Sequence, residues 1–177
     1  MRIAGPLLIA GALAGCTSAP PPPSQEEVFY VREGMVNGIN PPMEAIWNLQ
    51  VEVMDDYGNF DPDLMTADHW AMLNDAARQL EGAALIQSHA NTYVATAPGS
   101  TLPPAPVGTD LEAIQARLEA NPEAYNAFAQ ALAAHTTQLR EAVDARDTET
   151  ITQLVNNAQP VCKACHDVFW YPEEYQQ

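Results

Sequence analysis

The stretch Cys162-Lys163-Ala164-Cys165-His166 lies near the end of the chain, inside an otherwise apolar segment with helical periodicity. Two thiols at this spacing can add to the vinyl groups of a haem, and the adjacent imidazole can bind the haem iron from one face. A thioredoxin-like redox pair would require a βαβ context, and a zinc site would require further Cys or His ligands; neither is visible in the sequence. The motif therefore predicts one covalent c-type haem on Cys162 and Cys165, with His166 as an iron ligand.

The chain that precedes the motif has the apolar pattern of helices. Apolar residues recur at steps of three and four, which is typical of helices that bury one face. Four long helices are expected. The first runs from a capping box at Ser24 and Glu27 to about residue 56, and the second from Thr66 to about Ala95. The third runs from Asn121 to about Arg146, and the fourth from Asp147 or Thr148 through the haem motif. A shorter helix is expected from Thr109 to Ala120. No segment shows the alternation of a strand, so the sequence predicts an all-α fold, an antiparallel four-helix bundle with its covalent haem on the C-terminal helix.

Prolines mark the places where this pattern should be disturbed. Pro41 and Pro42 lie inside the first helix, where each lacks an N–H group and crowds the preceding turn, so we expect a kink or two helices end to end. Pro160 lies one turn before the haem motif and should bend or restart the last helix. Residues 97–108 contain four prolines and two glycines, which predicts a long connection without regular structure.

The N-terminus has the features of an export signal. Residues 1–15 carry one positive charge followed by a short apolar stretch and small residues, too short to span a bilayer as a stable helix. Leu13-Ala14-Gly15-Cys16 resembles the lipobox of bacterial lipoproteins, so we expect Cys16 to carry lipid; the alternative is an ordinary signal peptide that leaves Cys16 a free thiol. Lipidation is favoured because it leaves no cysteine unassigned. Residues 16–24 are then the lipidated Cys and a proline-rich tether, and residues 25–177 form the bundle domain.

The chain is strongly acidic. It has 23 acidic and 7 basic residues, a formal net charge of −16, and Lys163 is its one lysine. Such a surface repels nucleic acid and anionic lipid head groups, so no nucleic acid partner is expected. It favours basic partner proteins, although an acidic face that only interacts with solvent is an equally good interpretation.

Two motifs, one near each end of the predicted domain's sequence, resemble the cytochrome c prime family and its low-spin c-type relatives. His166-Asp167-Val168-Phe169 matches the aromatic residue that follows the haem motif in this family, and Tyr30-Val31-Arg32-Glu33-Gly34-Met35 matches its Tyr-x-Arg-x-x-Met or Leu pattern. The resemblance covers about residues 25–171. Pro41-Pro42, the proline-rich connection and Trp170, which stands where a basic residue often follows, depart from the plain family. Together with the lipobox at Cys16, the resemblance identifies the chain as a lipoprotein variant of the family.

The resemblance implies further residues at the haem. Met35 would face the distal side of the haem, either bound to iron through its thioether or packed over an empty sixth site. Arg32 would meet a haem propionate; its alternative is a pairing with Glu33 or another carboxylate. Phe169 would form part of the apolar wall. His135, on the apolar face of the third long helix, is either a core histidine or a neighbour or ligand of the haem.

The expected function is single-electron transfer through the covalent haem at the cell envelope, with redox proteins as partners. The alternative is binding of nitric oxide or carbon monoxide at a five-coordinate iron. No enzymatic activity is expected, because a haem peroxidase would need a distal acid or base, and the first helix offers only Met35 and Arg32. The expected location is the periplasm, with a lipid anchor in the outer rather than the inner membrane. The sequence leaves the oligomeric state open, with a homodimer as one alternative.

Overall fold

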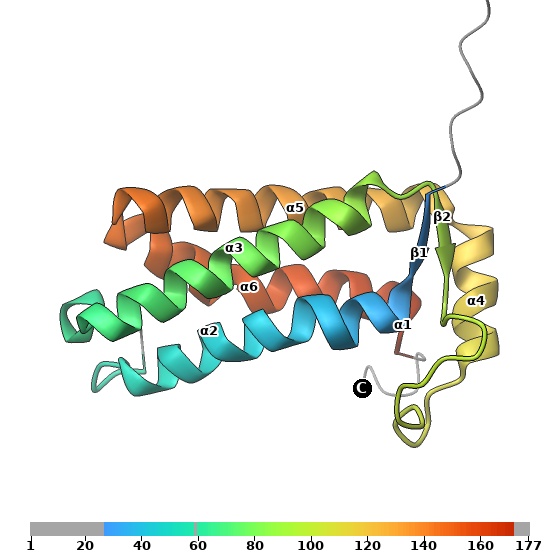
Figure 1. The fold of residues 1–177 in the computed structure, drawn as a ribbon, viewed down its shortest axis with the longest axis horizontal. Helices are drawn as coiled ribbons and strands as arrows, with labels where there is room; N and C mark the ends of the chain where they lie inside the picture. The colour runs from blue at the N-terminus through green and yellow to red at the C-terminus, as the bar shows by residue number, and fades with distance from the viewer. Residues whose placement is uncertain (1–26, 59, 172–177) are drawn as a thin grey trace, which may run out of the picture.

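Four long helices form an antiparallel bundle in the computed structural model, which describes residues 27–58 and 60–171. They are α2 (Asn40–Glu52), α3 (Ala67–His89), α5 (Pro122–Ala145) and α6 (Thr148–Phe169), and they lie side by side in Figure 1. The shorter α4 (Leu111–Ala120) stands across one end of the bundle. The predicted fold class is therefore confirmed, whereas the predicted signal, lipidation site and tether lie outside the described residues.

A short pair of strands interrupts the predicted helices. β1 (Val28–Tyr30) and β2 (Thr92–Val94) pair in parallel, with Phe29 opposite Tyr93. Three expectations are therefore wrong. The fold does contain strands, the first helix does not include residue 28, and the second helix does not reach Ala95. Asn91 explains the change, because its side-chain oxygen accepts from the Glu27 N–H at 3.0 Å and its own N–H donates to the Glu27 carbonyl at 3.0 Å. These bonds fix the first described residue beside the end of α3.

The first helix changes its winding before the two prolines. α1 (Val31–Gly34) continues as a π-helix (Met35–Ile39) and then as α2, which has Pro41 and Pro42 in its first turn. The Asn40 N–H donates to the Met35 carbonyl, five residues earlier, so the wider turn ends where the prolines begin. The prolines thus stand where a helix needs no N–H donors, and the expected disturbance takes the form of successive helical segments.

Most predicted helix starts agree with the caps in the structure. The Thr66 hydroxyl accepts from the His69 N–H at 3.2 Å, and the His69 side chain accepts from the Thr66 N–H in return. Asp147 caps α6 by accepting from the Thr150 N–H at 3.2 Å. α4 is capped by Asp110 rather than by the expected Thr109. At Pro160, where a bend or restart was expected, α6 continues without interruption.

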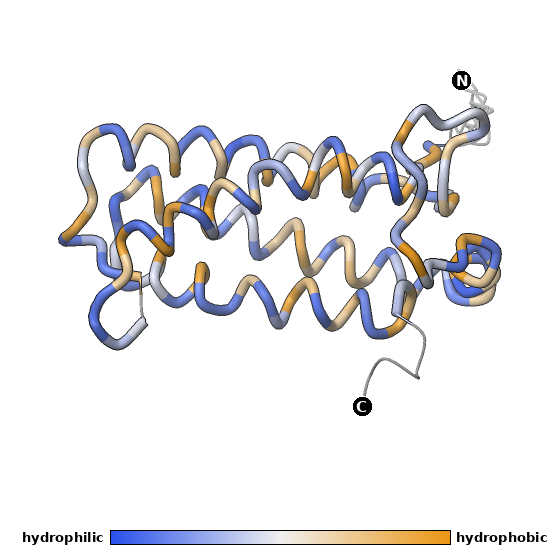
Figure 2. The backbone as a smooth tube through the Cα atoms, turned by 90° about the horizontal axis from the view of Figure 1, so that it is seen from below, coloured by the Kyte–Doolittle hydropathy of each residue, from blue (hydrophilic) through white to orange (hydrophobic). Residues whose placement is uncertain are grey.

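The buried apolar side chains form two clusters. The larger one lies along the bundle between α2, α3, α5 and α6. The smaller one joins β1, β2 and α4 to the adjoining parts of α5 and α6, around Tyr125 and Phe169. Figure 2 shows hydrophobic and hydrophilic residues alternating along the helices, as expected when one face of each is buried. None of the helices described is long and apolar enough to cross a membrane.

Gly34 is required where α1 passes β1. A Cβ atom at Gly34 would lie 2.0 Å from Cζ of the buried Phe29 ring. Gly34→Ala should therefore lower the free energy of unfolding by roughly 1–3 kcal/mol, as overpacking does. Gly82 in α3 is the matched control, because a Cβ there meets nothing within 4 Å. Gly82→Ala should instead stabilise the protein by about 0.5–1 kcal/mol. Urea unfolding of the two variants measures both values, and equal effects would contradict the assigned contact.

Candidate haem-binding site

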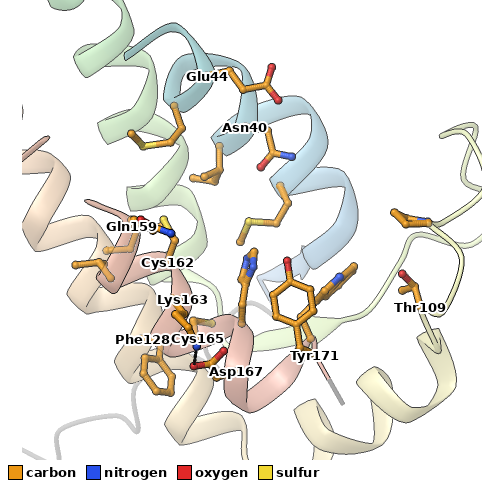
Figure 3. A pocket seen from close by; sticks show the side chains of 18 of the residues that line it. Asn40, Glu44, Thr109, Phe128, Gln159, Cys162, Lys163, Cys165, Asp167 and Tyr171 are labelled. Atoms are coloured by element: carbon orange, nitrogen blue, oxygen red, sulfur yellow. Dashed lines mark hydrogen bonds and ion pairs between the residues drawn. The ribbon is translucent and has the colours of Figure 1, made fainter. Parts of the chain in front are cut away.

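A cavity of about 770 Å³ opens between α6, the first helix and α5. This volume lies in the range of roughly 300–1,000 Å³ that cofactor sites occupy. The turn at residues 106–109, which follows the proline-rich connection, closes one side of it. Figure 3 shows the cavity with Cys162, Cys165 and Phe128 below and Asn40 and Glu44 above.

α6 brings the three residues of the sequence motif to this cavity. Cys162, Cys165 and His166 all line it, and the two cysteines are free thiols. Burial raises the pKa of Cys162 and raises that of Cys165 to about 12, so both are neutral thiols at pH 7. Burial also lowers the pKa of His166. A neutral imidazole keeps a lone pair for a metal, so the donor set fits a thioether-linked haem with one histidine ligand.

The first helix supplies the apolar wall of the cavity. Met35, Ile39 and Met43 line it, and Ile39 and Met43 are each only 4% exposed. Met35 begins the π-helix and is partly buried. The structure thus brings Met35 to the same cavity as His166, while its place on the distal side of the haem stays a prediction.

Arg32 does not line the cavity. Its side chain is buried and Nη2 donates to the Pro103 carbonyl in the proline-rich connection. Glu33, its alternative partner, instead accepts from the Thr96 hydroxyl and the Ala97 N–H, both at 3.0 Å. Burial alone would raise the pKa of Glu33, but hydrogen bonds from this segment lower it overall. Both residues hold the connection in place, and the contact of Arg32 with a propionate stays a prediction.

Neither Phe169 nor His135 lines the cavity. Phe169 is 2% exposed and meets Tyr125 and Phe128 edge to face, at centroid distances of 5.1 and 6.2 Å. Of these, Phe128 lines the cavity, so Phe169 supports the wall from behind. His135 is half-buried outside the cavity lining, and burial lowers its pKa. The structure therefore brings Met35 to the motif but not His135.

Two residues that the sequence reasoning did not single out belong to the site. The Tyr171 ring meets the His166 ring edge to face, with centroids 5.5 Å apart, and its N–H donates to the His166 carbonyl at 2.9 Å. Gln87 of α3 lines the cavity at 2% exposure. Tyr171 could have been found by its position in the turn after His166, whereas no local pattern marks Gln87. Lys163 and Asp167 form an ion pair at the cavity edge (Figure 3).

Comparison with known proteins gives one match. The sequence model of the Cytochrome C' family matches residues 65–170, more than half of the chain and all of the haem motif. No curated protein and no solved structure matches the chain. Proteins of this family carry one covalent haem c and are generally not enzymes. Because the match includes Cys162, Cys165 and His166, the chain belongs to the cytochrome c' family and binds one haem c covalently.

Proposed function

We propose that this protein transfers single electrons through its haem, with His166 and Met35 as the two iron ligands. The observation that supports this is the position of both side chains in the wall of one cavity, His166 from α6 and Met35 from the first helix. When bound, the haem supplies the one-electron chemistry. A thioether opposite a histidine raises the reduction potential, which suits electron transfer.

The residues around these two ligands would control the potential and the access of partners. Ile39 and Met43 exclude water from the inner wall, and an apolar wall disfavours the more highly charged oxidised state. Tyr171 and Lys163 are exposed at the edge, where electrons could pass to another protein. The net charge of −16 favours a basic redox partner, whose approach would slow as salt is added.

We also propose that the mature protein is attached to a bacterial membrane by lipid on Cys16. The basis is the sequence Leu13-Ala14-Gly15-Cys16 and the proline-rich residues that follow it. Members of the family are typically periplasmic, which agrees with an export signal. A tether of this kind would hold the haem domain near membrane-bound donors, with the outer membrane as the proposed site.

A second function, binding of nitric oxide or carbon monoxide at a five-coordinate iron, is favoured by the packing of Met35. This side chain contacts both apolar clusters of the protein. The Met35 side chain therefore has a stabilised position without any bond to iron. In that case the sixth coordination position of the iron would be open to a gas.

Met35→Ala separates these two functions. If Met35 is a ligand, the oxidised variant should lose its weak sulfur-to-iron absorption band, become high-spin and fall in reduction potential. Met43→Ala is the matched control, because Met43 lines the same cavity and is not a proposed ligand. The free energy of unfolding of both variants should fall by roughly 2–5 kcal/mol at most, because each loses a buried or partly buried side chain. If the spectrum and potential of Met35→Ala equal those of the parent, Met35 only packs in the core.

Cys16→Ser tests the anchor in the native host. The variant should be released as a soluble protein or retained with an uncleaved signal, because it lacks the thiol that is acylated. Membrane fractionation and the mass of the processed N-terminus measure this. A correctly processed variant that stays in the membrane fraction would refute lipidation at Cys16.

A further inference from the structure

Gln87 is an unusual member of the cavity lining. The lining residues within the described segments include three that are buried, namely Ile39, Met43 and Gln87, and Gln87 alone of these is polar. The polar residues Asn40, Glu44 and Gln159 also line the cavity, but they are exposed at its edge (Figure 3). A buried amide in this inner wall therefore requires a reason, because an apolar side chain would avoid the cost of desolvation.

Tyr125 holds the Gln87 amide in place. Gln87 Nε2 donates to the Tyr125 hydroxyl at 2.7 Å, and Tyr125 is 1% exposed. The Tyr125 ring is itself fixed between Tyr93 and Phe169, with centroids 4.4 and 5.1 Å away. The pair joins α3 to α5, so the amide cannot move far without breaking a buried contact.

The hydrogen bonds of this amide are incomplete. Gln87 Oε1 is buried and has no partner among the described residues. Leaving such a group unpaired costs about 1–3 kcal/mol, which needs an explanation in a native protein. An amide also has two N–H donors, and the bond to Tyr125 uses one of them.

Either orientation of the amide leaves a donor for a ligand. In the orientation described, the second N–H of Nε2 is available. After a half-turn of the amide, the Tyr125 hydroxyl can donate to Oε1, which pairs the oxygen and leaves both N–H groups available. Burial raises the pKa of Tyr125, so its hydroxyl keeps its proton and remains a donor.

We infer that Gln87 donates a hydrogen bond to a diatomic ligand, such as carbon monoxide or nitric oxide, bound to the haem iron opposite His166. This inference rests on the second function proposed above and names a residue that would stabilise the bound gas. The free end of such a ligand is a hydrogen-bond acceptor, and among the three buried lining residues of the described segments Gln87 alone carries a hydrogen-bond donor in its side chain. One neutral hydrogen bond contributes about 0.5–1.5 kcal/mol, which corresponds to roughly two- to tenfold in affinity.

The test uses the haem-loaded Met35→Ala protein, in which the thioether cannot compete for the iron. Its reduced carbon monoxide complex is compared with that of Met35→Ala/Gln87→Leu. Infrared spectroscopy gives the C–O stretching frequency of each complex, and a titration gives the dissociation constant of carbon monoxide. Loss of the donor should raise the C–O stretching frequency and weaken carbon monoxide binding roughly two- to tenfold. Gln159→Leu in the same background is the matched control, because this glutamine lines the edge of the same cavity, and it should change neither value.

Two outcomes distinguish the inference from the function on which it rests. If Met35→Ala shows no carbon monoxide band at all, the second function fails and the inference fails with it. If the band is present but unchanged by Gln87→Leu, only the inference is overturned.

Tyr125→Phe is a second variant for the case in which Gln87→Leu does not fold, because it removes only the hydroxyl that fixes the Gln87 amide. The C–O band should then broaden, and an unchanged band would equally overturn the role of Gln87.

Discussion

The attachment of a rigid, flat cofactor to one turn of one helix is the constraint on which the rest of the structure depends. Cys162, Cys165 and His166 lie within five residues of α6, so the position of the haem is fixed once this helix is placed. The neighbouring helices must then leave room beside that turn, and residues of both apolar clusters line the resulting cavity of about 770 Å³. A cavity of this size removes packing contacts from its walls, so haem binding and stability are coupled in this bundle.

The connection between α3 and α4 follows from the same constraint. A second element must close the side of the cavity that the bundle leaves open, and residues 106–109 do so without regular structure. Such a segment contributes few hydrogen bonds of its own, so its position depends on contacts with α1. Arg32 bonds the Pro103 carbonyl, and Glu33 bonds Thr96 and Ala97. One turn of the first helix therefore both approaches the haem site through Met35 and holds the segment that closes it.

The features that the sequence predicted are those that depend on neighbours along the chain. The helix starts at Thr66 and Asp147 were predictable because each side chain caps the turn that follows it. Pro122 suits the first turn of a helix, whereas the Asn121 side chain makes no cap bond. The α6 motif is predictable for the same reason. β1 and β2 were missed because each has only three residues and their pairing brings residue 28 to residue 92. Gln87 was missed because its role comes from Tyr125, on a helix almost forty positions later. Met35 was found only through resemblance to a family.

In the roles proposed for them, Met35 and Gln87 would act on one equilibrium in opposite directions. A gas that binds iron must first displace any bound thioether, and its apparent affinity falls by the fraction of protein in which the sixth site is open. A preference of about 1.4 kcal/mol for the Met35-bound state would lower gas affinity roughly tenfold. A single hydrogen bond from Gln87 contributes up to about the same amount. With these proposed roles, electron transfer and gas binding need not exclude each other, because the bond from Met35 would set one side of this balance and the hydrogen bond from Gln87, which Tyr125 holds in place, would set the other.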